Sequence, residues 1–308
     1  MLTVVASLIP VFLLMALGYG LRRTLLTRDD YWIGLEQLVY YVLFPALLIE
    51  TLARADLSTV PVAGVGGALL LSVIVMAALC LALRPLLARA LGLGGPSFTS
   101  VFQGAVRWQT FVALSVVGNM LGSPGLAMAA VAMVAMTPLI NVMSVSVLAY
   151  FAAPGRTSLR ATLLAIARNP FIWGCLIGIA VNLSGVAVPQ PLYAFAGSLG
   201  HSSLAIGLLV VGAGLRLDGL RRPGGAALVA VVLKLIVMPS IAIALGIAFG
   251  LSGASLVVVA CCASVPSASN AYVLARQMGG DAPLLAQILV LQTVLAALTM
   301  PLFIALAE

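Results

Sequence analysis

The stretch Ser264-Val265-Pro266-Ser267-Ala268-Ser269-Asn270 lies in the middle of an apolar run that extends from residue 254 to residue 278. Pro266 has no backbone N–H and disfavours helix in the residue before it, so a helix through this run is interrupted here. Small hydroxyl side chains and the Asn270 amide can bond the backbone groups that an interruption frees. The stretch therefore predicts a membrane-spanning helix that is broken near its midpoint. The alternative is an ordinary proline kink whose serines bond back to their own helix.

The rest of the sequence is too poor in charge for a water-soluble protein. Of its 308 residues 63% are hydrophobic and only 7% are charged, whereas soluble domains carry roughly 25% charged residues. Lipid must then be the main solvent of the folded chain. The formal net charge of +7 resides in short loops between apolar runs, so it indicates orientation in a membrane and not nucleic-acid binding. We expect an all-α membrane protein.

Ten apolar runs are long enough to cross a bilayer, which takes about 20 residues. Residues 1–153 and 154–308 each hold five of them, and Pro10 and Gly18 correspond to Pro170 and Gly178 at an offset of 160. Because five spans are an odd number, the second half must enter from the opposite face. This predicts two inverted five-helix repeats in one membrane domain, a common construction of secondary transporters. The predicted spans are 3–21, 33–53, 62–83, 98–120, 124–150, 159–183, 189–213, 224–248, 254–278 and 283–306.

The arginines lie almost entirely on one side of these spans. The other side holds only Arg54. Cytoplasmic loops carry an excess of Lys and Arg, so this distribution predicts an inner-membrane protein with both termini on the external side. The apolar residues 3–21 precede Arg22 and Arg23, which favours a retained first span over a cleaved signal peptide. The twelve arginines on the inner side are Arg22, Arg23, Arg28, Arg84, Arg89, Arg156, Arg160, Arg168, Arg216, Arg221, Arg222 and Arg276.

A second polar segment in the fourth span corresponds to the proline break at an offset of 158. It places Arg107 near the bilayer centre, where an arginine costs at least ~2.5–3.5 kcal/mol unless it faces protein or water. One interpretation is a clamp for a carboxylate, because guanidinium stays charged and binds carboxylate in a bidentate way. The other is compensation of exposed helix carbonyls. The predicted binding residues, on crossed broken helices 4 and 9, are Arg107, Gln109, Thr110, Pro266, Ser267, Ser269 and Asn270.

Other polar residues in the spans have simpler interpretations. Lys234 either neutralises helix C-termini or carries a proton as a coupling group. Glu50 and Arg54 are spaced for a local ion pair, and His201 is expected to be packed and hydrogen-bonded. We expect interhelical hydrogen bonds from Asn119, Asn141, Gln287 and Gln292, and buried unpaired thiols at Cys80, Cys175, Cys261 and Cys262. These residues suggest no metal site, no cofactor and no enzyme centre.

At these motifs the sequence resembles the auxin efflux carrier family, in the bacterial branch that includes malonate-type permeases. The shared segments are Ile9-Pro10, Leu17-Gly18-Tyr19, 43–48, Lys234-Leu235 with Pro239, 265–275 and Gly279-Gly280-Asp281. The resemblance implies ten spans, transport of small carboxylates and a possible homodimer. It also implies a role for Arg107 as the arginine of the fourth span. Gln109 departs from the asparagine that the family usually has, which puts the identity of the substrate in doubt.

The sequence therefore predicts a secondary active transporter of a small organic anion that works by alternating access. Proton coupling is one hypothesis, although no acidic residue lies in the fourth, fifth, ninth or tenth span. A sodium-coupled symporter of the bile-acid type is an alternative, since carbonyl and hydroxyl groups near a broken helix can bind sodium. A membrane sensor without transport is a further alternative.

Overall fold

The computed structural model describes residues 2–55, 62–152, 170–186, 188–215 and 223–308. All regular elements in these ranges are helices. Within this part of the chain six helical segments are long and apolar enough to cross a membrane, and three shorter apolar helices lie at 136–151, 170–184 and 253–264. This confirms the all-α membrane class. Residues 159–169 of the predicted sixth span lie outside the described residues, as do six of the arginines assigned to the inner side.

The helices follow the apolar runs closely. In chain order they are α1 (Leu2–Thr24), α2 (Asp29–Leu38), η1 (Val39–Leu43), α3 (Phe44–Arg54), α4 (Val62–Leu91), α5 (Gly95–Val106), α6 (Thr110–Phe151), α8 (Pro170–Ser184), α9 (Gln190–Ala213), α10 (Gly225–Val232), η3 (Leu233–Val237), α11 (Met238–Ala248), α12 (Gly253–Ser264), α13 (Asn270–Met278) and α14 (Ala282–Ala305).

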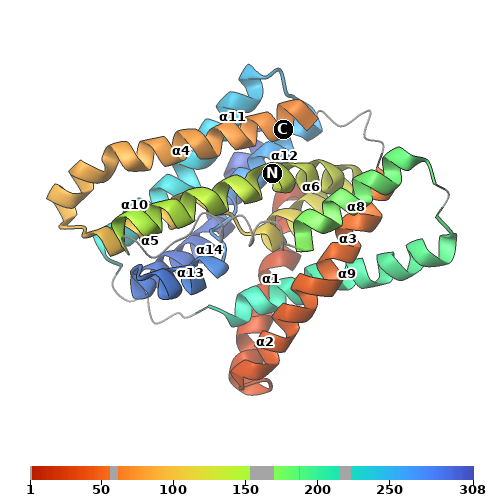
Figure 1. Ribbon diagram of the computed structural model, residues 1–308, viewed down its shortest axis with the longest axis horizontal. Coiled ribbons are helices and arrows are strands. Elements are labelled where there is room, and N and C mark those ends of the chain that lie inside the picture. The colour runs from red at the N-terminus through yellow and green to blue at the C-terminus, as the bar shows by residue number, and fades with distance from the viewer. Residues whose placement is uncertain (1, 56–61, 153–169, 187, 216–222) are drawn as a thin grey trace.

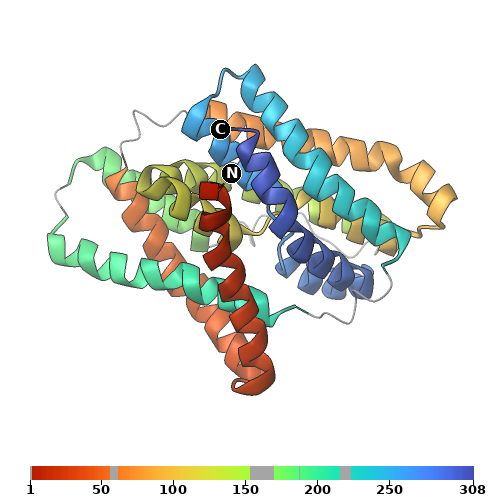
Figure 2. The same cartoon turned by 180° about the vertical axis from the view of Figure 1, so that it is seen from behind.

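The helices form two groups (Figures 1 and 2). One group, here called the panel, contains α1, α2, η1, α3, α8 and α9, with α3 packed on α8 and α9 and α1 packed on α9. The other, here called the bundle, contains α4, α5, α10, η3 and α11–α14. Helix α6 contacts helices of both groups. Each group draws helices from both halves of the chain.

Glycines bring the helices of the panel into backbone contact. A Cβ atom on Gly18 of α1 would overlap the carbonyl oxygen of Leu209 on α9, and one on Gly212 of α9 would overlap that of Met15 on α1. In a membrane, helices gain attraction mainly by close packing, so small residues at the contact let the two backbones approach. The pair Gly18 and Gly212 thus explains how α1 and α9 approach so closely where they cross (Figure 2).

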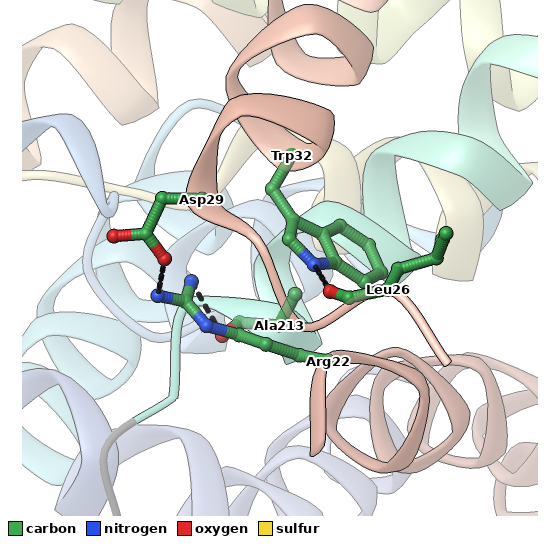
Figure 3. A network of polar contacts seen from close by, with 5 residues as sticks. All are labelled: Arg22, Leu26, Asp29, Trp32 and Ala213. Carbon is green, nitrogen blue, oxygen red and sulfur yellow. Dashed lines mark hydrogen bonds and ion pairs between the residues drawn. The ribbon is translucent and has the colours of Figure 1, made fainter. Parts of the chain in front are cut away.

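A polar network joins the end of α1 to the start of α2 and the end of α9 (Figure 3). The Arg22 guanidinium donates to the Ala213 carbonyl at 3.2 Å and pairs with Asp29 at 2.6 Å. Ala213 is the last residue of α9, where carbonyl groups have no partner within the helix. The buried indole of Trp32 donates to the Leu26 carbonyl at 2.7 Å. Arg22, one of the arginines that predict orientation, therefore also caps a helix.

Two π-helical turns, η1 and η3, each precede a proline. Pro45 and Pro239 stand at the second residue of α3 and α11, the helices that follow these turns. A proline cannot donate to the carbonyl four residues before it and its ring crowds that carbonyl. A wider π-turn accommodates both effects without ending the helix.

Helix α6 changes direction at Gly122. This residue has φ 62° and ψ −152°, a conformation open to glycine, and Pro124 follows two residues later. The predicted boundary between the fourth and fifth spans lies at residues 123–125, so the kink falls beside it.

We expect Gly18→Ala and Gly212→Ala to destabilise the protein by about 1–3 kcal/mol, because a methyl group at either site forces the two backbones apart. The check is the thermal unfolding of each purified variant in detergent. Gly20→Ala is the matched control, since no atom lies within 4 Å of its new Cβ and alanine favours helix. A melting temperature of Gly18→Ala equal to that of Gly20→Ala would contradict the tight α1–α9 contact.

Candidate functional site

Two helices of the protein stop in the middle of apolar sequence and start again a few residues later. Helix α5 ends at Val106 and α6 begins at Thr110, while α12 ends at Ser264 and α13 begins at Asn270. The C-cap residues, which directly follow α5 and α12, both have an extended backbone: Arg107 has φ −77° and ψ 157°, and Val265 has φ −66° and ψ 152°. Helices α5 and α12 each have 12 residues and are displaced by 158 positions at both ends. The two breaks are thus built alike.

The two breaks bond directly to each other. The Gln109 backbone N–H donates to the Pro266 carbonyl at 2.8 Å, and the Gln109 side-chain amide donates to the Ser269 hydroxyl at 3.1 Å. The Ser267 hydroxyl donates to the Gly104 carbonyl in the last turn of α5. Residues about 160 positions apart in the chain therefore form one polar centre.

Two helix N-termini meet at this centre. Gln109 is the N-cap residue of α6 and Ser269 that of α13, and neither side chain bonds the first N–H groups of its own helix. Instead the two cap side chains bond each other. In the first turn of α13 the Ala271 and Tyr272 N–H groups bond the Ala268 and Ser269 carbonyls. At this N-terminus the helix dipole, more than free N–H groups, favours an anion.

Arg107 places a positive charge in the same centre. Only 5% of this residue is exposed. Its guanidinium donates from Nη1 to Asn270 Oδ1 at 2.7 Å, from Nη2 to Asn141 Oδ1 at 2.8 Å and from Nε to Ser144 Oγ at 3.3 Å. All three acceptors are neutral, and in the described part of the chain the ion pairs join other residues. The charge of Arg107 is solvated by amides and a hydroxyl, with no carboxylate partner there.

The structure brings all seven predicted binding residues into this centre. Arg107, Gln109, Pro266 and Ser267 are buried, Thr110 is partly buried, and Ser269 and Asn270 are exposed. Access to the centre therefore lies on the side of Ser269 and Asn270. Sequence reasoning missed Ser144, and it assigned Asn141 only a general interhelical role. The two stand one turn apart on α6, a spacing that indicates a shared polar partner.

Lys234 does not join this centre by any hydrogen bond within the described residues. It is completely buried in η3, and its Nζ has no hydrogen-bond partner there. Both predicted roles of Lys234 stay predictions.

A separate pocket of about 250 Å³ lies between α3 and α9. Glu50, Arg54, Tyr193 and His201 line it. The predicted ion pair is confirmed, with Arg54 Nη1 at 3.4 Å from Glu50 Oε1, and the Arg54 guanidinium also stacks on the Tyr193 ring at 4.4 Å. Because this cation already has a carboxylate, the pocket lacks the unbalanced charge found at Arg107. The expectation that His201 is packed is wrong, because it is exposed, on the face of α9 that lines this pocket.

The cysteines are buried and unpaired, as expected. In the residues that the structure describes, no group of three or more His, Cys, Asp and Glu side chains could hold a metal ion.

We expect Ser267→Ala to lower the free energy of unfolding by about 0.5–1.5 kcal/mol, because it removes a hydrogen bond between the two breaks. Ser264→Ala is the matched control: its hydroxyl is equally buried but bonds the Ala260 carbonyl of its own helix. Thermal unfolding in detergent compares the two. Equal losses would contradict a specific contribution of Ser267 to holding the breaks together.

Comparisons with known proteins agree with this architecture. The model of a family described as "Membrane transport protein" matches residues 3–127 and 155–304. An uncharacterized transporter of Methanothermobacter thermautotrophicus is 28% identical over 304 residues, which cover 96% of each chain. The chain therefore belongs to the membrane transport protein family, the family of the auxin efflux carriers.

Proposed function

We propose that the protein is a secondary transporter of a small organic anion, such as a carboxylate, and that the anion binds at Arg107 between the two helix breaks. The observation that carries this proposal is the charge of Arg107. A buried guanidinium is costly unless an anion pairs with it. Its described partners are all neutral, so the centre has a net positive charge that a bound carboxylate would balance.

The helix N-termini support the same ligand. The N-termini of α6 and α13 have no side-chain cap. A carboxylate there would gain a favourable dipole at both helices and hydrogen bonds from the first turn of α6. Thr110 and Asn270 stand at the first position of these helices. A two-oxygen anion could thus bond Arg107 on one side and a helix N-terminus on the other.

The arrangement of the helices supports alternating access within two inverted five-helix repeats, residues 1–153 and 154–308. The panel and the bundle each take helices from both halves of the chain, and α5 repeats as α12 at a constant offset. In this proposal ten spans cross the inner membrane with both termini outside. The bundle and the N-terminal end of α6 form the anion site, the bundle rocks against the panel, and a proton or sodium gradient supplies the driving force.

We expect purified protein in liposomes to take up labelled small carboxylates with saturable kinetics, and Arg107→Gln to abolish this uptake by removing the positive charge. Each substrate is tested with and without an imposed pH or sodium gradient, and the gradient that accelerates uptake identifies the coupling ion. Arg54→Gln is the matched control, since Arg54 already pairs with Glu50; its uptake should stay within about twofold of the wild type. Uptake by a folded Arg107→Gln variant at the wild-type rate would contradict the site. If no carboxylate is taken up under any gradient, the result would favour the alternative that the protein is a membrane sensor without transport.

A second variant tests the charge without removing the arginine. Asn141→Asp has nearly the same shape as the wild type and places a carboxylate at the position of an oxygen now 2.8 Å from Arg107 Nη2. We expect this internal carboxylate to neutralise the guanidinium, to keep or raise the melting temperature, and to raise the KM for uptake at least about tenfold. If Arg107 only compensates helix carbonyls, Asn141→Asp leaves the KM unchanged. Uptake kinetics and thermal unfolding of the same preparation separate these outcomes.

A further inference from the structure

Gln292 of α14 connects three separate parts of the bundle through one side chain. The residue is completely buried. Its Oε1 accepts from the Ser267 backbone N–H at 3.0 Å, and its Nε2 donates to the Gly104 carbonyl at 2.9 Å and to the Ala230 carbonyl at 3.1 Å. Both hydrogens of the amide and its oxygen are therefore used, by groups on the two breaks and on α10.

Two of the three groups that Gln292 bonds lie at the breaks, where backbone groups lose their helical partners; the Gly104 carbonyl also accepts from the Ser267 hydroxyl. The carbonyl of Gly104 would bond the N–H of Trp108 in a continuous helix, but α5 ends before that residue. The N–H of Ser267 lies in the non-helical segment between α12 and α13. Unbonded backbone groups are costly away from water. Gln292 satisfies one such group on each broken helix at once.

Close packing holds α5 and α14 together at the same level. A Cβ atom on Gly104 would lie 2.8 Å from Ile288 Cγ2 and 3.4 Å from Ala230 Cβ. Ile288 stands one turn before Gln292 on α14. The absence of a side chain at Gly104 therefore lets its carbonyl come within hydrogen-bonding distance of Gln292.

Two of the three backbone groups that Gln292 bonds lie three residues before the residues that pair across the breaks. Gly104 precedes Arg107, and Ser267 precedes Asn270; the Arg107 guanidinium and the Asn270 amide are 2.7 Å apart. Among the residues that the structure describes, Gln292 bonds backbone groups and neither of these side chains, so it acts on them through the backbone.

We propose that Gln292 is a positioning residue that sets the spacing of Arg107 and Asn270, and thereby the affinity for the anion. This inference rests on the proposed function. A side chain that only stabilised the fold would change the amount of folded protein and its melting temperature. A positioning residue changes the KM of the protein that does fold.

The experiment compares uptake by Gln292→Met, Gln292→Glu and Thr293→Val in liposomes of equal protein content. Methionine keeps the length of the side chain and removes all three hydrogen bonds; we expect the KM to rise about tenfold while the maximal rate stays within about twofold. Thr293→Val is the control at the next position, where the hydroxyl bonds only the Leu289 carbonyl of its own helix; its KM should equal that of the wild type. A KM for Gln292→Met equal to that of the wild type, or matched by Thr293→Val, overturns the inference.

Gln292→Glu tests the same point if Gln292→Met does not fold. A protonated glutamic acid can accept from the Ser267 N–H and donate to the Gly104 carbonyl, whereas an ionised one repels both carbonyl groups. The ratio of its KM to the wild-type KM at the same pH should therefore fall toward one as the pH is lowered. A ratio independent of pH contradicts the role of these bonds in affinity.

Arg107→Gln, run beside these variants, separates the two proposals. If Arg107→Gln loses uptake but Gln292→Met has a normal KM, the proposed site is supported and the positioning role of Gln292 is contradicted. Normal uptake in Arg107→Gln removes the proposed site and, with it, the role of Gln292.

Discussion

Backbone groups freed in the middle of a lipid-facing protein must find partners within the protein, and this constraint organises the structure. Helices α5 and α12 stop in the middle of apolar sequence, and the groups at their ends bond each other and a small set of side chains. Gln109, Ser267 and Gln292 supply most of these bonds. Each bond contributes only about 0.5–1.5 kcal/mol, but leaving the groups unbonded would cost several times more. The breaks can therefore exist only as a pair, each serving as the other's partner.

The same constraint explains how the Arg107 cation is held by neutral groups among the residues that the structure describes. Carbonyl oxygens of Asn141 and Asn270 and the hydroxyl of Ser144 accept from the Arg107 guanidinium. Neutral acceptors satisfy the hydrogen bonds of the guanidinium but do not balance its positive charge. An aspartate in place of either asparagine would bind the arginine more strongly, but its carboxylate would also neutralise the charge that a bound anion needs. A site that must bind and release an anion gains from partners of this intermediate strength.

Local sequence features predicted the parts of the site that depend on local chemistry. Pro266 indicated the break after α12 because a missing N–H acts within its own helix, and the four-residue spacing of Glu50 and Arg54 indicated their ion pair. The break after α5 has no proline and was predicted only from its correspondence with the second half of the chain. The threefold bonding of Gln292 was not predictable, since its partners lie 25, 62 and 188 residues away. His201 failed as a prediction because polarity in a helix does not reveal which face the fold leaves uncovered.

The distribution of tight contacts indicates where the molecule can move. Within the panel, helices approach so closely that a Cβ atom would meet a neighbouring backbone at Gly18, Gly174, Gly178, Gly200 and Gly212. Within the bundle, hydrogen bonds tie α5, α10 and α14 to the break before α13. Each group thus resists internal deformation, since packed interiors respond to strain as units. A movement that exposes the site to alternate sides of the membrane would deform the structure least if these two groups shifted against each other as whole bodies. Helix α6 contacts both groups and bends at Gly122, so it would have to follow both, and the contact of α1 with α14 would have to shift as well.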